Sequence, residues 1–226
     1  MCSHSCIEFG RSCLGREDVE GKSVIEVGAL DVNGSLRSVV ETLAPASYVG
    51  VDIQHGPGVD VICDANDLVT HYDVDMFDVV IASVMLEHVR DWRNVTSNLK
   101  RVLKPGGILI VIVPSKNFPY HGYPFDYWRY EITDMEYIFS DLDIEIMQER
   151  PEESLLFMRA RKPIRFVEKD LINYPLHSIL TGACVPDITD IEICKFKFRM
   201  LPRRVAVKVL PAKIINLLKR HFFQRE

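Results

Sequence analysis

The side chains best suited to chemistry stand where short apolar runs end. Asp52 closes the apolar run 47–52, and Ser83 closes the run 77–83. In an open sheet of parallel strands such positions share the carboxyl edge, where ligands bind. A carboxylate like that of Asp52 can accept hydrogen bonds from both vicinal hydroxyls of a ribose. The pattern predicts a nucleoside site at Asp52, with an acid capping a surface loop as the alternative.

The segment 22–34 supplies the first strand and turn of such a site. A β-branched run ends at Val27, as is typical of a strand buried on both faces of a parallel sheet. Gly28 then lets backbone approach a ligand closely. A nicotinamide-binding turn needs further glycines around the pyrophosphate, but Leu30 stands at the second position. The acid Glu26 suits a cationic cofactor without phosphate, so a nicotinamide oxidoreductase is the less favoured alternative.

Four segments in order resemble class I S-adenosylmethionine-dependent methyltransferases of the type-11-like branch. The resemblance extends over residues 20–162 and implies an α/β fold: a doubly wound, mostly parallel seven-stranded sheet with helices on both faces. It departs from the family at Leu30 and Val32, which replace two glycines of the usual Gly-x-Gly-x-Gly. The four segments are Glu26-Val27-Gly28, Tyr48-Val49-Gly50-Val51-Asp52, Phe77-Asp78-Val79-Val80-Ile81-Ala82-Ser83 and Arg101-Val102-Leu103-Lys104-Pro105-Gly106-Gly107.

The resemblance implies S-adenosyl-L-methionine as the cofactor. Asp64 with Ala65 would lie against the adenine, although Asp64 could equally cap a short helix at 65–71. The residues implied in cofactor binding are Glu26, Gly28, Ala29, Asp52, Ile53, Asp64, Ala65 and Ser83.

The stretch 114–130, rich in prolines and aromatic residues, is expected on the acceptor side of the site. Loops of this length inside a compact domain are usually functional, and its His-x-x-Pro-x-Asp-x-Trp-Arg pattern resembles one branch of the type-11-like enzymes. Arg129 could bind an acidic group or pair with Asp126, and a lid packed by its own aromatic residues is the alternative. The candidate bases are His121, Asp126 and His88, and the candidate substrate contacts are Tyr123, Tyr127, Trp128 and Arg129.

The acceptor class follows from a motif that is missing after the run 77–83. Enzymes that methylate amino groups of nucleic acids carry an Asn/Asp-Pro-Pro-aromatic motif there, and this chain has Val84-Met85-Leu86. We therefore expect a small-molecule or glycan-intermediate acceptor, methylated at oxygen, and no nucleic acid. A non-catalytic adenosyl-binding or scaffold module is the alternative from another class.

The chain is expected to have three parts: a leader at 1–21 with one short helix over the mouth of the crevice, a methyltransferase domain at 22–162, and an extension at 163–226. Inside the domain, strands are predicted at 23–27, 47–52, 59–63, 77–83, 108–113, 142–149 and 154–161, and helices at 35–43 and 91–103. Thr133 and Glu136 have the spacing of a capping box, which predicts the start of a helix at Thr133.

Composition favours a cytoplasmic globular protein. The 226 residues are 47% hydrophobic and 26% charged, without an apolar run of the about 18 residues that a membrane span needs. The first residues lack the features of a secretory signal. Six unevenly spaced cysteines predict no disulfide framework, and Cys2, His4, Cys6 and Cys13 match no common zinc spacing, so no metal site is expected.

The extension ends in a strongly basic segment. Residues 195–226 hold ten Lys/Arg and one acid, whereas the residues before them hold 17 basic and 31 acidic side chains. This asymmetry predicts an acidic partner, a membrane surface or the acidic body of the protein as the contact. Apolar residues at helical spacing in 211–223 indicate an amphipathic helix, for which packing on the body is favoured over membrane contact.

Overall fold

The structure, a computed structural model, describes residues 4–122 and 125–200. Its contacts divide the chain into one compact unit at 1–186 and a second at 187–226. The second unit holds helix α7 (Asp190–Met200), whose first turn is closed by bonds from the Thr189 backbone N–H and hydroxyl to Glu192. The predicted helix at 211–223 lies outside the described residues. Among the described residues, no helix has the length and apolar character to cross a bilayer.

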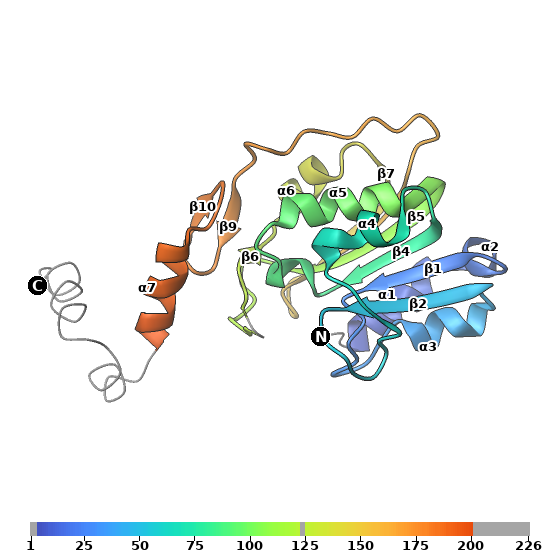
Figure 1. The fold of residues 1–226 in the computed structure, drawn as a ribbon, viewed down its shortest axis with the longest axis horizontal. Coiled ribbons are helices and arrows are strands. Elements are labelled where there is room, and N and C mark those ends of the chain that lie inside the picture. Colours follow the sequence, from blue (N-terminus) through green and yellow to red (C-terminus); the bar gives the residue numbers. More distant parts are fainter. Residues whose placement is uncertain (1–3, 123–124, 201–226) are drawn as a thin grey trace, which may run out of the picture. The chain divides into compact units, whose positions relative to one another are not determined.

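A seven-stranded sheet in the spatial order β3-β2-β1-β4-β5-β8-β7 forms the centre of the first unit (Figure 1). Neighbouring strands from β3 to β5 are parallel, and only β8 is antiparallel to both of its neighbours. The predicted doubly wound, mostly parallel sheet is therefore confirmed. The strands are β1 (Ser23–Val27), β2 (Ser47–Asp52), β3 (Val61–Ile62), β4 (Phe77–Ser83), β5 (Leu103–Pro114), β7 (Asp143–Arg150) and β8 (Leu155–Arg161).

Two strands differ in length from the prediction. The strand expected at 59–63 is only β3, because it pairs at the sheet edge through Val51 with Val61 and Asp52 with Ile62. The strand expected at 108–113 begins earlier, since Leu103 already pairs with Phe77 before an irregularity shifts the register.

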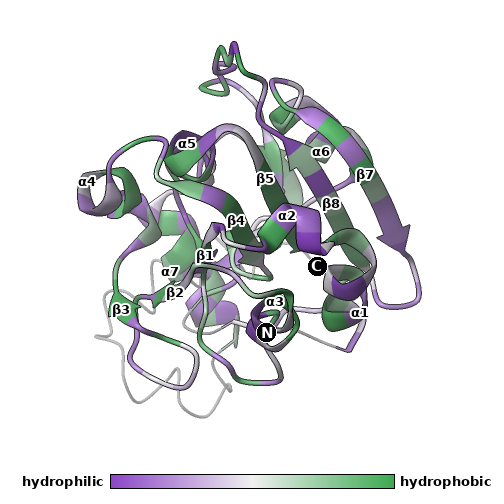
Figure 2. Ribbon diagram, turned by 90° about the vertical axis from the view of Figure 1, so that its right-hand side faces the viewer, coloured by the Kyte–Doolittle hydropathy of each residue, from purple (hydrophilic) through white to green (hydrophobic). Residues whose placement is uncertain are grey.

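Helices cover both faces of this sheet, and its central strands are mostly apolar, whereas β7 at the edge is largely hydrophilic (Figure 2). On one face α1 and α3 pack on alternate residues of the central strands, among them Val24, Val79 and Ile110. On the other face α5 buries Trp92 and Leu99. The helices of the first unit are α1 (His4–Cys13), α2 (Arg16–Val19), α3 (Arg37–Val40), α4 (Leu68–Tyr72), α5 (Trp92–Val102) and α6 (Ile132–Ile138), with short 3-10 helices η1 (Glu41–Leu43), η2 (Ala65–Asp67) and η3 (Leu86–His88).

The leader contributes to the core of the first unit. Cys6, Phe9 and Cys13 on α1 are buried in the cluster on that sheet face, and the Phe9 ring lies 5.1 Å from that of Phe157. Burial raises the pKa of Cys13 to about 12, so this thiol stays protonated. No disulfide joins the described cysteines.

The predicted start of α6 is wrong. Its capping box joins Glu131 and Asp134 rather than Thr133 and Glu136, and the Glu131 N–H donates to Asp134 Oδ2 at 2.8 Å. The helix begins at Ile132, so Thr133 already lies inside the first turn. An acid can close a first turn in this way, and the Ser/Thr spacing rule does not look for it.

A second, three-stranded sheet joins the stretch 114–130 to the extension. β6 (Trp128–Arg129) pairs with β9 (Leu176–Ser178), which pairs with β10 (Ala183–Val185). Arg93 on α5 also donates to the carbonyl oxygens of Leu171 and Tyr174 at 2.7 and 2.6 Å. Residues 163–186 are thus packed as part of the first unit.

A buried ion pair attaches α5 to the end of α6. Lys100 Nζ donates to Asp141 Oδ2 at 2.8 Å and to the Ile138 carbonyl oxygen at 2.7 Å. The two charged side chains are 1% and 3% exposed. Burial lowers the pKa of Lys100, and the attraction of Asp141 opposes that effect.

Lys100→Met should lower the free energy of unfolding by about 3–5 kcal/mol, because it leaves the Asp141 carboxylate buried without its counter-charge. The matched control is Lys104→Met, whose partner is Asp78 at 2.9 Å and whose side chain is 40% exposed. That exposed pair is worth about 0–1 kcal/mol. Urea unfolding followed by circular dichroism measures both, and equal losses would contradict the assignment.

Candidate active site

The turn after β1 is closely packed against the loop after β4. Gly28 has φ +80°, and a Cβ added there would lie 2.5 Å from the Cβ of Met85. The N–H groups of Gly28 and Ala29 donate to the Val51 carbonyl oxygen at 2.9 and 3.0 Å. Only glycine meets both conditions, the positive φ and the close approach.

Asp52 lies beside that turn. Its Oδ2 accepts from the Leu30 N–H at 3.3 Å and its Oδ1 from the Gln54 N–H at 3.0 Å. Each carboxylate oxygen has a second acceptor position. The structure therefore brings Gly28, Ala29 and Asp52 together at the carboxyl edge, and Ile53 next to them is exposed.

Glu26 has a different environment. It is 3% exposed and accepts from the hydroxyls of Ser35, at 2.9 Å, and Tyr48. Burial raises the pKa of Glu26, against the effect of these bonds. Its carboxylate fixes the segment leading to α3 on the strands β1 and β2.

The remaining predicted cofactor residues lie at the ends of β3 and β4. Asp64 caps η2, with Oδ1 accepting from the Asn66 N–H at 2.8 Å, which is the structural alternative considered for it. Ala65 is buried beside it. The buried hydroxyl of Ser83 has no hydrogen-bond partner among the described residues. Val84 follows at φ +52°, a strained conformation for a β-branched residue and one found near functional sites.

Next to Ser83 along the chain, η3 meets the long loop after β5 in a cluster of three residues, Glu87, His88 and His121. Glu87 Oε1 lies 3.4 Å from His121 Nε2 and 3.7 Å from His88 Nε2. Glu87 is fully buried. Two of the predicted bases, His88 and His121, therefore meet around Glu87, which is not among the predicted bases.

Asp126 fixes His121 from its other side. His121 Nδ1 lies 3.0 Å from Asp126 Oδ2, and the His121 backbone N–H donates to the same oxygen. Burial by itself would raise the pKa of Asp126, but bonds from Arg129 and His121 hold it well below its usual range. Burial would lower the pKa of His121, yet the carboxylates of Asp126 and Glu87 raise it to about 9. His121 is therefore protonated at neutral pH and is not a ready proton acceptor.

Arg129 and the aromatic residues near it face inward. Arg129 is fully buried, donates to both oxygens of Asp126 at 2.5 and 2.6 Å, and also bonds the carbonyl oxygens of Phe118 and Pro119. This is the Asp126 pairing considered as the alternative for Arg129. Trp128 is fully buried and donates to the Val89 carbonyl oxygen at 2.9 Å.

Tyr127, also predicted as a substrate contact, is 7% exposed, and its N–H donates to the Glu87 carbonyl oxygen at 2.7 Å. Tyr123 lies outside the described residues. The structure thus brings together His88, His121 and Asp126, whereas it places Trp128 and Arg129 inside the packing of the loop.

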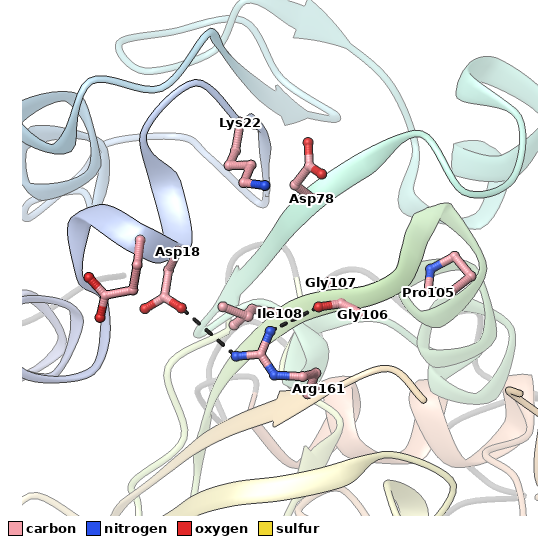
Figure 3. A pocket seen from close by; sticks show the side chains of 9 residues that line it. Asp18, Lys22, Asp78, Pro105, Gly106, Gly107, Ile108 and Arg161 are labelled. Carbon is pink, nitrogen blue, oxygen red and sulfur yellow. Dashed lines mark hydrogen bonds and ion pairs between the residues drawn. The ribbon is translucent and has the colours of Figure 1, made fainter. Parts of the chain in front are cut away.

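A polar cavity of about 190 Å³ lies at the opposite edge of the sheet (Figure 3). Three of its charged side chains are paired: Arg161 lies 3.8 Å from Asp18 and donates to the Gly106 carbonyl oxygen, and Asp78 accepts from Lys104. Open α/β sheets bind ligands at the carboxyl edge. The cavity is therefore not the candidate active site.

Residues 20–111 match a family model described as a methyltransferase domain. Over these residues the chain is therefore similar to methyltransferases. The predicted resemblance to the type-11-like branch is confirmed. The match contains Gly28, Asp52 and Ser83 and ends inside β5, before the loop that supplies His121 and Asp126.

The curated proteins similar to this chain are also methyltransferases. Ubiquinone biosynthesis O-methyltransferase of Coxiella burnetii is 27% identical over 135 residues, which is 54% of this chain and 53% of that protein. The chain thus spans about half the length of the curated relatives it matches.

Solved structures share the fold of the methyltransferase domain. The 1,6-didemethyltoxoflavin-N1-methyltransferase of Burkholderia thailandensis has a TM-score of 0.56 and 16% identity, over 70% of this chain and 78% of that one. An S-adenosylmethionine-dependent methyltransferase from Mesorhizobium loti has a TM-score of 0.52 and 18% identity, over 68% and 95%.

Gly28→Ala should destabilise the methyltransferase domain by about 1–3 kcal/mol more than Gly21→Ala, because the added methyl would overlap Met85. Gly21 is the matched control: it has φ +67°, but nothing lies within 4 Å of its added Cβ. Both substitutions place alanine at positive φ, so the difference isolates the contact with Met85. Thermal and urea unfolding of the two variants test this, and equal losses would contradict it.

Proposed function

We propose that this protein transfers a methyl group from S-adenosylmethionine to an oxygen of a small-molecule or glycan-intermediate acceptor. The observation that carries the proposal is the matched domain with Asp52 hydrogen-bonded to the turn after Gly28. The name of the Coxiella burnetii relative supports oxygen as the acceptor atom. The bound S-adenosylhomocysteine named for the Burkholderia thailandensis enzyme supports the cofactor.

The cofactor would lie across the carboxyl ends of β1 to β4. Asp52 has free acceptor positions for the ribose hydroxyls, and the backbone after Gly28 is close to it. Asp64 and Ala65 are assigned to the adenine, and the buried hydroxyl of Ser83 to the end near the sulfonium. Ile53 would cover the ribose. Glu26 would act indirectly, because its carboxylate holds Ser35 and Tyr48.

In the reaction the acceptor oxygen attacks the methyl carbon and forms the O–CH₃ bond. The C–S bond breaks, its electron pair stays on sulfur, and S-adenosylhomocysteine leaves as a neutral thioether. The hydroxyl proton must also leave, and the cluster of Glu87, His88 and His121 is the candidate place for that step. Since the sulfonium is already activated, alignment and exclusion of water supply most of the catalysis.

Label transfer tests the proposal. The protein is incubated with S-adenosylmethionine carrying a radioactive methyl group and either a panel of phenols and catechols or a small-molecule extract. We expect label in products whose methyl group is lost on ether cleavage. Binding of the cofactor without turnover would instead favour the non-catalytic adenosyl-binding module. If calorimetry detects no binding of S-adenosylmethionine, both the methyltransferase and the adenosyl-binding module are contradicted.

Asp52→Asn should weaken S-adenosylmethionine binding by about 10- to 100-fold, since hydrogen bonds to a charged acceptor contribute about 1.5–3 kcal/mol. Asp143→Asn makes the same chemical change at the exposed start of β7 and should leave affinity unchanged. Titration calorimetry on both variants measures the difference. Equal affinities would show that the ribose lies elsewhere.

A further inference from the structure

The cluster of Glu87, His88 and His121 has the spacing of metal ligands. One ligand atom from each residue lies within 4.8 Å of the others. Glu87 Oε1 is 3.4 Å from His121 Nε2 and 3.7 Å from His88 Nε2. Two atoms that each lie about 2.1 Å from a tetrahedral zinc ion are about 3.4 Å apart. A cation therefore fits among the three atoms with only small shifts.

Both imidazoles are oriented for coordination through Nε2. His88 Nδ1 lies 2.6 Å from the Phe125 carbonyl oxygen, and His121 Nδ1 lies 3.0 Å from Asp126 Oδ2. These oxygens can only accept, so each Nδ1 carries a proton. The Nε2 atom of each ring then faces Glu87, and a cation bound at His121 would displace the proton that this imidazole carries at neutral pH. Metal-binding histidines are held in this way by an outer carboxylate or carbonyl.

The environment of the Glu87 carboxylate also points to a bound cation, independently of the ligand spacing. Its side chain is fully buried, and neither carboxylate oxygen has a hydrogen-bond partner among the described residues. Beside it lie the imidazoles of His121 and His88, at 3.4 and 3.7 Å. Burying a carboxylate without hydrogen bonds is costly, and such groups are normally paired or coordinate metals. Asp126, the other buried acid of this loop, is by contrast satisfied by Arg129.

We propose that Glu87, His88 and His121 bind a divalent cation of the zinc type. Two imidazoles and one carboxylate suit Zn²⁺, Fe²⁺ or Co²⁺, whereas Mg²⁺ and Ca²⁺ prefer all-oxygen sites. Three protein ligands leave one position open, as in catalytic zinc sites. This site goes beyond the expectation from sequence, which included no metal.

The cation would lie where the acceptor is expected. Glu87 and His88 follow β4, and His121 follows β5; these two strands are parallel neighbours, with Ser83 opposite Ile112 near their carboxyl ends. A hydroxyl bound at the open position would lose its proton more readily, because a cation lowers the pKa of an oxygen bound to it. This last step, unlike the metal site, rests on the proposed function.

Cobalt(II) is the probe for the test. The untagged full-length chain is stripped with a chelator and titrated with Co²⁺, whose visible absorption reports coordination, and bound Zn²⁺ is counted after dialysis. We expect one equivalent of either ion. His121→Asn keeps a donor toward Asp126 but removes Nε2, and Glu87→Gln keeps the buried shape. Each should weaken Co²⁺ binding by more than about 100-fold, beyond the 10- to 100-fold typical of outer partners.

His71→Asn is the matched control, because His71 is exposed on α4 and outside the cluster. It should bind Co²⁺ like the original chain. Equal binding by all variants, or no binding by the original chain at one equivalent, would overturn the site. The titration of the original chain tests the site even if Glu87→Gln does not fold.

Calorimetry with S-adenosylmethionine on the same samples separates this inference from the proposed function. If the protein binds cobalt but not S-adenosylmethionine, the metal site is supported and the proposed function is contradicted. If it binds S-adenosylmethionine but not cobalt, the metal site is contradicted and the proposed function is unaffected. Asp52→Asn should retain cobalt binding while it loses affinity for the cofactor.

Discussion

The paired bonds between Asp126 and Arg129 are the interaction on which the site depends. Both residues are fully buried, so separating the pair would leave two charges that water does not solvate. Arg129 uses its remaining donors on carbonyl oxygens of the same loop, which folds the stretch after β5 back on itself. Asp126 in turn holds His121 by ring and backbone. The position of His121 over Glu87 is a consequence of that pair.

The strands of the fold could be predicted from sequence because their signal is local. β1, β2 and β4 coincide with the predicted ranges, and β1 and β4 are β-branched runs buried on both faces. β3 and the start of α6 could not be predicted as well. The extent of an edge strand depends on its partner, and the α6 cap uses Glu131, an acid that composition rules do not single out.

The proximity of Gly28 and Asp52 was predictable and that of Glu87 and His121 was not, for one physical reason. Gly28 and Asp52 follow strands whose neighbours in the sheet are set by the fold. Glu87 and His121 are brought together by a loop, and residue types in a loop do not say which way a side chain points. Trp128 and Arg129 were therefore expected at the surface of a pocket, but they form the interior of the loop. Glu87 is buried with two imidazoles beside its carboxylate, and this arrangement is visible only in three dimensions.

The small sheet formed by β6, β9 and β10 extends the compact unit beyond the last strand of the seven-stranded sheet. Trp128 and Arg129 sit opposite Ser178 and His177, so backbone from well past the seven-stranded sheet completes the packing of the acceptor loop. A chain that ended after β8 would leave the edge of β6 that pairs with β9 exposed. The compact unit at 1–186 is thus larger than the matched stretch 20–111, and its added residues hold the loop that carries His121 and Asp126.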